Sequence, residues 1–284
     1  YLSAIDYAIQ NGRHGKGCVI VFCSGNRRSG SQTEEVSSNA SLSNVLSVGG
    51  TTEHGYRVSL TPFWNDPDPS WESCYGDSLD LMAPGYGIST TCYSSNDCYT
   101  SFEGTSAAAP HVAGVAALVL SIDSTLTHRE VFEILCSTAT KVHHGEENGY
   151  VYASNPAYPY GAWNNEMGYG LVNAHHAILK TLYRDYYMTG TSEIGLCETS
   201  SYHVHGTTPF NDSITCGWSS SSNIEILSTT DSLVARGTRP GPGWVAFNII
   251  HDNDSLPLVF PVNVTNGGIT ILSNHEFTGN VTLS

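Results

Sequence analysis

The stretch FEGTSAAAPHVAGVAALVL, residues 102–120, places a Gly-Thr-Ser turn directly before a run of Ala, Val and Leu. Gly104 permits a tight turn, so Ser106 is predicted at the start of a helix, with its backbone N–H directed to where negative charge would be stabilised. Pro110 is expected near the first turn, where most N–H groups have no partner within the helix. The helix is apolar on nearly all sides, so we expect it to be buried and to hold Ser106 rigidly, as a nucleophile requires.

A histidine in the same helix is a candidate base for Ser106. His111 follows Ser106 by five positions, and at roughly 100° per residue its side chain points about 140° away around the helix axis. The two side chains therefore cannot meet without breaking the helix. We interpret His111 as a structural histidine.

The surrounding region, residues 1–182, alternates helical and strand patterns. The predicted strands are the unalternated apolar runs CVIVF (18–22), NVLSVGG (44–50) and LDLMAPG (79–85). Predicted helices lie at residues 2–9, after a Thr127–Glu130 capping box, and from Asn173 onwards. This alternation predicts an α/β fold with a parallel sheet covered on both faces.

A second predicted feature lies at the carboxyl end of the CVIVF strand, the edge where open α/β sheets bind their ligands. Asn26, in the Ser-Gly-Asn turn that follows this strand, is predicted to offer its side-chain amide to an oxyanion. The backbone N–H of Ser106 is the predicted second donor.

Taken together, these features resemble those of the subtilisin-like serine proteases. The motifs that carry the resemblance occur in the family's order and are GCVIVFCSGN (17–26), LDLMAPG (79–85), GTSAAAPHVAGVAALVL (104–120) and GYGLVNAHHAI (168–178). The form of residues 12–26 is closest to the kexin-like or fervidolysin-like side of the family. The resemblance covers residues 1–182 and implies a subtilisin-like three-layer parallel sheet, present in part.

The resemblance also implies roles for individual residues. Ser106 would be the nucleophile that forms an acyl-enzyme, and Asn26 would be the oxyanion donor. The implied substrate-binding residues, which include one wall of the pocket for the residue before the cleaved bond, are Phe22, Cys23, Ser24, Gly25, Gly104 and Thr105. The family's catalytic Asp and His precede the asparagine strand, and no such motif occurs here in that order, so both are expected upstream. His-His-Gly at 143–145 comes too late in the chain.

From residue 183 the helical period disappears, and short β-rich runs alternate with turns, which predicts a β-sandwich over 183–265. Residues 188–206, 214–227 and 243–249 resemble Ig-like modules of secreted bacterial proteins, with Tyr202 and Trp218 as core anchors. A glycan-binding platform of Tyr202, Trp218 and Trp244 is the alternative. Residues 266–284 are expected to begin a further β-rich unit.

Composition limits the partners and the compartment. The 284 residues carry 11 basic against 26 acidic side chains, a net charge of −15, which disfavours a nucleic-acid partner. The pattern of a charged segment followed by an apolar leader is not expected in this sequence, nor is an apolar run long enough to cross a bilayer. Eight cysteines in an acidic, Ser-rich chain favour an oxidising, extracytoplasmic setting, secreted or at a bacterial cell surface.

Within this set of cysteines, Cys92 and Cys98 bracket a turn and are the predicted disulfide pair. Cys18 and Cys23 lie at odd spacing on one predicted strand, face opposite ways, and are expected to stay unpaired as small buried hydrophobes. No cofactor is expected for the chemistry. Structural calcium is implied by the family alone, and Asp66 and Asp68 are interpreted as part of a Pro-rich turn rather than as a metal site.

Two classes of function follow. The first is a secreted subtilisin-like endopeptidase that acts on protein or peptide substrates. The second is a non-catalytic surface or adhesion protein that keeps the same scaffold for binding. The Gly104-Thr105-Ser106 turn and Asn26 favour the first, because a binding scaffold has no physical need for either.

Overall fold

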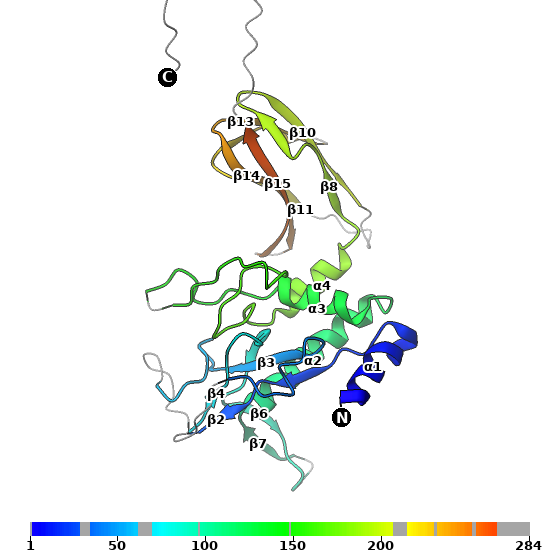
Figure 1. Ribbon diagram of the computed structural model, residues 1–284, viewed down its shortest axis with the longest axis vertical. Coiled ribbons are helices and arrows are strands. Elements are labelled where there is room, and N and C mark those ends of the chain that lie inside the picture. The colour runs from blue at the N-terminus through cyan, green and yellow to red at the C-terminus, as the bar shows by residue number, and fades with distance from the viewer. Residues whose placement is uncertain are drawn as a thin grey trace, which may run out of the picture. The chain divides into compact units, whose positions relative to one another are not determined.

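The computed structural model describes residues 2–28, 35–61, 70–95, 97–147, 149–206, 215–229, 232–251 and 254–265. The chain forms two compact units, one ending at Leu182 and one beginning at Tyr183 (Figure 1). Each unit has its own hydrophobic core.

Three parallel strands form the centre of the first unit. They are β1 (Val21–Cys23), β3 (Leu46–Thr51) and β5 (Leu81–Pro84), in the order β1-β3-β5. Val21 lies opposite Leu46, and Val48 lies opposite Leu81. The three apolar runs therefore form the parallel sheet that the sequence predicts.

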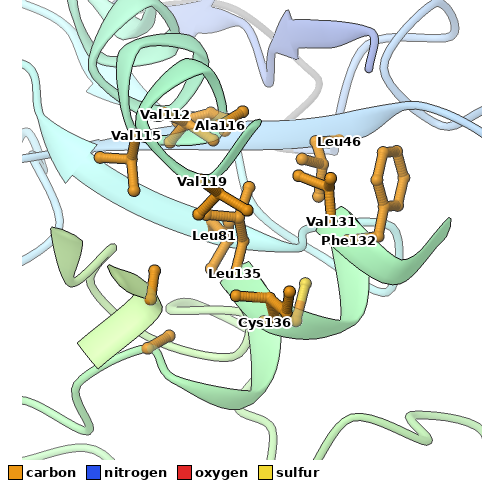
Figure 2. Packing of buried hydrophobic residues seen from close by; sticks show 14 of the residues in the cluster. Leu46, Leu81, Val112, Val115, Ala116, Val119, Val131, Phe132, Leu135 and Cys136 are labelled. Atoms are coloured by element: carbon orange, nitrogen blue, oxygen red, sulfur yellow. The ribbon is translucent and has the colours of Figure 1, made fainter. Parts of the chain in front are cut away.

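Helix α2 (Thr105–Ile122) packs on all three strands of this sheet, and α3 (His128–Ser137) and α4 (Ala174–Leu182) pack against α2 in the same hydrophobic core. Figure 2 shows Val112, Val115 and Val119 of α2 against Leu46 and Leu81 of the strands. The helix starts agree with the sequence. Thr127 and Glu130 form the predicted capping box on α3, and the side chain of Asn173 accepts the backbone N–H of His176 at 2.9 Å ahead of α4.

The other face of the sheet differs from the prediction. Met82, whose neighbours in β5 point into the helical core, packs instead with Leu79, Tyr150, Tyr152 and Met167. Three of these come from the irregular segment between α3 and α4. Loops carrying aromatic side chains therefore cover much of a face for which helices were expected.

The first helix, α1 (Leu2–Gly15), is also less regular than its sequence stripe predicts. Arg13 and His14 adopt left-handed backbone angles, with φ of 53° and 58°, so the regular helix ends before them. Ile9 is buried, whereas Leu2 is exposed.

The central helix α2 is only partly covered, which corrects the expectation that it is buried all round. Pro110 is its sixth residue, one turn later than expected, and removes the N–H that would bond to the carbonyl of Ser106.

By length and composition α2 is also apolar enough to cross a membrane, with a mean hydropathy of 1.6, so the sequence does hold such a run. Its packing on the sheet is that of a core helix, which makes this weak evidence for a membrane span.

Two short antiparallel ladders flank the carboxyl edge of the parallel sheet. One joins β2 (Asn26–Arg27) to β4 (Glu72–Ser73), and the other joins β6 (Ile88–Thr91) to β7 (Tyr99–Phe102). A disulfide joins Cys92 to Cys98 at the tip of the β6–β7 hairpin, with Cα atoms 5.2 Å apart.

The remaining cysteines of the first unit are free thiols. Cys18 precedes β1 rather than lying in it, and Cys23 ends that strand. Both are partly buried, which corrects the expectation that they are fully buried.

The second unit consists of two four-stranded sheets. Its strands are β8 (Tyr187–Thr189), β9 (Glu193–Gly195), β10 (Thr199–His205), β11 (Thr215–Ser220), β12 (Ile224–Thr229), β13 (Leu233–Gly237), β14 (Gly241–His251) and β15 (Asp254–Thr265). The sheet orders are β12-β13-β10-β8 and β11-β14-β15-β9. Side chains from both sheets form one core, so the sheets pack face to face.

Aromatic residues of this unit serve the core. Tyr202 is 0% exposed and its ring lies 5.7 Å from that of Phe260 on the other sheet. Trp218 is partly buried against the same core, as predicted. The alternative of a glycan platform that includes Tyr202 is therefore wrong, because the tyrosine ring cannot reach a ligand. Residues 266–284 lie outside the described part of the chain.

One buried carboxyl group lies at the amino edge of the parallel sheet. Asp80 precedes β5 and lines a cavity of about 410 Å³ with Phe132 and Tyr169. Its Oδ2 accepts the backbone N–H of Ser47 at 2.8 Å. Burial raises the pKa of Asp80 from 3.8 to about 7, although the bond from Ser47 favours the ionised form.

We expect Asp80 to make stability depend on pH. The folded state holds its proton more tightly than the unfolded chain, so this contribution is fully present below pH 3.8 and is lost as the pH rises through about 7. Asp80→Asn keeps the acceptor for Ser47 and cannot ionise. At pH 8 the variant should have a higher free energy of unfolding than the parent. Its free energy of unfolding should not fall as the pH rises through about 7, as measured by urea unfolding. The control is Asp77→Asn, an exposed carboxylate of the same cavity; an Asp80 variant that follows the parent at every pH contradicts the expectation.

The hairpin disulfide is testable by peptide mapping. After exposure to air and without reduction, Cys92 and Cys98 should resist alkylation and appear joined, whereas the partly buried thiol of Cys23 should react once the protein is unfolded. Recovery of both hairpin cysteines as free thiols would remove the disulfide.

Candidate active site

The candidate nucleophile lies at the start of α2, at the carboxyl edge of the parallel sheet. Ser106 is the second residue of the helix and is exposed. Gly104 precedes the helix with φ of 121° and ψ of 166°, a backbone conformation that favours glycine. Its N–H bonds to the carbonyl of Gly85 at 2.8 Å, which ties the turn to the end of β5. The turn and the sheet together hold Ser106 at a fixed point.

Asn26 and Thr105 form a clamp beside Ser106. The Oδ1 of Asn26 accepts the backbone N–H of Thr105 at 2.8 Å and its hydroxyl at 3.0 Å. The Thr105 hydroxyl oxygen in turn accepts the N–H of Gly25 at 3.3 Å. Thr105 is 0% exposed whereas Asn26 is exposed, so these bonds are partly shielded from water. The clamp joins the turn after β1 to the start of α2.

The clamp decides which end of the Asn26 amide is available. Since Oδ1 accepts two donors from Thr105, Nδ2 is the end that can donate to a ligand. A Cβ placed on Gly104 would lie 3.3 Å from this Nδ2, so a larger residue there would crowd the amide. The N–H of Ser106 lies in the first helical turn, where the helix supplies no partner. Both donors, together with the positive end of the helix dipole, favour an anion beside Ser106.

The hydroxyl of Ser106 meets a thiol rather than a base. In the described part of the chain its hydrogen-bond partner is the Sγ of Cys23, at 3.9 Å. His111 places Nδ1 2.9 Å from the carbonyl of Ala107, one turn back in its own helix, which agrees with a structural role. His143 is engaged elsewhere, with Glu146 and the carbonyl of His54.

Comparisons with known proteins agree with this geometry. The sequence profile described as the Subtilase family matches residues 1–170, more than half of the chain. The chain belongs to the subtilase family. Among curated relatives, a calcium-dependent protease of Trichormus variabilis is 32% identical over 189 residues, which cover 62% of this chain and 26% of that protein. Subtilisin DY of Bacillus licheniformis is 37% identical over 129 residues, 45% of this chain and 42% of that protein.

The match to solved structures is looser. The protease MycP1 from Mycobacterium smegmatis is 23% identical with a TM-score of 0.44, over 62% of this chain and 44% of that one. This chain therefore spans less than half the length of the relatives named here.

The predicted substrate-binding residues of this subtilase divide into two groups. Phe22, Cys23 and Gly25 are partly exposed along the end of β1 and the turn after it. The side chains of Ser24 and Thr105 are 0% exposed, which corrects their assignment to substrate binding. Gly104 is buried as well. Sequence reasoning therefore missed that Thr105 supports Asn26, and the only signal for it was its place directly before Ser106.

Across the residues that the structure describes, no group of three or more His, Cys, Asp or Glu gathers as a metal site would require. Asp66 and Asp68, interpreted as a turn, lie outside the described residues.

The clamp is testable through the free energy of unfolding. Thr105→Val keeps the buried volume but removes two hydrogen bonds and leaves polar groups of Gly25 and Asn26 without this partner. We expect a loss of about 1–3 kcal/mol in urea unfolding. Thr100→Val, at an exposed position in β7, is the matched control and should change stability by less than about 0.5 kcal/mol. Equal effects of the two substitutions would mean that the clamp does not stabilise the fold.

Proposed function

We propose that the chain is the later part of the catalytic domain of a secreted subtilisin-like serine endopeptidase, followed by an Ig-like module. Ser106 attacks the peptide carbonyl and forms the acyl-enzyme. The Asn26 amide and the Ser106 N–H stabilise the negative oxygen of the tetrahedral intermediate. The observation that carries the proposal is the clamp in which Thr105 occupies the Oδ1 of Asn26 and leaves Nδ2 as the end of the amide that can donate.

A base for Ser106 completes the mechanism. A serine hydroxyl is a weak nucleophile until a base accepts its proton, and Cys23 is not such a base for it in this geometry. The proposed base is a histidine, oriented by an aspartate, on sequence upstream of residue 1. An exposed side of α2 next to Ser106 supports this, because small and apolar residues there are left uncovered: Pro110, Ala113, Gly114, Ala117 and Leu118.

The proposed setting and the second unit rest on separate observations. The Cys92–Cys98 disulfide and the acidic composition support a secreted or surface location, where disulfides persist. Two four-stranded sheets around one core support the Ig-like assignment of residues 183–265. Calcium dependence belongs to the relative that carries it in its name, and the described residues of this chain offer no three-ligand group for a metal.

Activity-based labelling tests the proposal. Residues 1–284 alone should not label at Ser106 with a fluorophosphonate probe, because the probe also needs an activated serine. The same chain extended upstream through the expected Asp and His should label, and Ser106→Ala should abolish the labelling. Ser101→Ala, at an exposed position in β7, is the matched control and should label normally.

The outcomes separate the two classes of function. If the extended protein is folded, free of an inhibitory propeptide and still unlabelled, the endopeptidase assignment fails. The alternative of a surface or adhesion protein that uses the subtilase scaffold for binding then takes its place.

A further inference from the structure

The strand that carries Asn26, β2, belongs to a very short backbone ladder. β2 and β4 pair over two residue pairs only, Asn26 with Ser73 and Arg27 with Glu72. So short a ladder gives little restraint to the position of Asn26. Side-chain contacts across the ladder therefore matter more here than in a long sheet.

One such contact is an ion pair across the ladder. Arg27 directly follows Asn26, and its Nη1 donates to the Oε2 of Glu72 at 3.1 Å. The side chain of Glu72 is 9% exposed and that of Arg27 is 22% exposed. Water therefore screens this pair weakly, and the link between the two strands is stronger than a surface pair would be.

A second arginine completes the charge balance around Glu72. The other oxygen, Oε1, accepts Nη1 of Arg57 at 2.9 Å, and the same guanidinium donates to the carbonyl of Ser73 at 3.0 Å. The Nε of Arg57 donates to the Oε2 of Glu166 at 2.8 Å. Burial by itself would lower the pKa of Arg57, but the carboxylates of Glu166 and Glu72 raise it above its ordinary value. Two positive and two negative charges thus form one network.

We propose that Glu72 is a positioning residue for the oxyanion amide of Asn26. Thr105 fixes the rotation of the amide, and Glu72 fixes the strand beneath it by holding Arg27, while Arg57 neutralises the second oxygen of Glu72. The inference rests on the proposed function, because it assigns Glu72 a part in the same site. Buried ion pairs often contribute little to stability. Positioning of Asn26 is a second role for this pair.

Steady-state kinetics of the full-length enzyme test this role. Glu72→Gln keeps the shape of the side chain but removes the charge that holds Arg27. Removing an interaction that is made only in the transition state lowers kcat and leaves KM nearly unchanged. We expect kcat to fall about tenfold to a hundredfold, the loss expected if the Asn26 amide is misplaced by about 1 Å. Titration with a fluorophosphonate gives the fraction of active enzyme, to which kcat is normalised.

Glu166→Gln is the matched control for a purely structural role. It makes the same chemical change in the same network, but Glu166 is 41% exposed and touches Arg57 rather than Arg27. Both variants should lower the melting temperature, and only Glu72→Gln should lower kcat. If Glu72→Gln does not fold, Arg27→Met breaks the same link at a more exposed position, leaves Arg57 to balance Glu72, and should lower kcat in the same way.

The Asn26→Ala background decides whether Glu72 acts through Asn26. Loss of an oxyanion donor costs on the order of a hundredfold to a thousandfold in kcat, a magnitude measured on subtilisin itself. In this background Glu72→Gln should have no further effect on kcat. A full additional loss overturns the positioning role, and so does a normal kcat for both Glu72→Gln and Arg27→Met. A normal kcat for Asn26→Ala instead means that the proposed oxyanion role fails.

Discussion

The bonds from Thr105 to Asn26 are the constraint on which the candidate site depends. They join two turns that are 79 positions apart in sequence, one after β1 and one before α2. Without them the helix could still present Ser106, but the amide of Asn26 would be free to rotate and the proposed oxyanion donor would be lost. Burial of Thr105 partly shields these bonds from competition with water, so a single threonine joins the two halves of the site.

The rest of the first unit places these two turns side by side. Parallel strands bring their carboxyl ends to one edge, so β1 delivers Asn26 and β5 delivers the backbone that anchors Gly104 to the same place. The apolar side of α2 packs on all three strands and fixes the helix start relative to that edge. The core therefore acts on the site indirectly, by leaving α2 a single position on the sheet.

Membership of the subtilase family and the geometry of the site rest on different observations. Family membership rests on residues 1–170 as a whole. The geometry adds what a family match does not contain, namely that Ser106 contacts Cys23 and that a network of two arginines and two glutamates lies under Asn26. These contacts explain how this sequence would keep an oxyanion donor in place on a ladder of two residue pairs.

Sequence alone determined the local features of this protein. The apolar runs became parallel strands, Thr127 and Glu130 capped their helix, and the Gly-Thr-Ser turn put Ser106 at a helix start. Such features depend on residues within one or two turns of each other, so a local pattern encodes them. Tertiary structure decided the rest. It buried Ser24 and Thr105, placed Cys23 against the candidate nucleophile Ser106 and set Glu72 between two arginines, because such contacts depend on where distant segments meet.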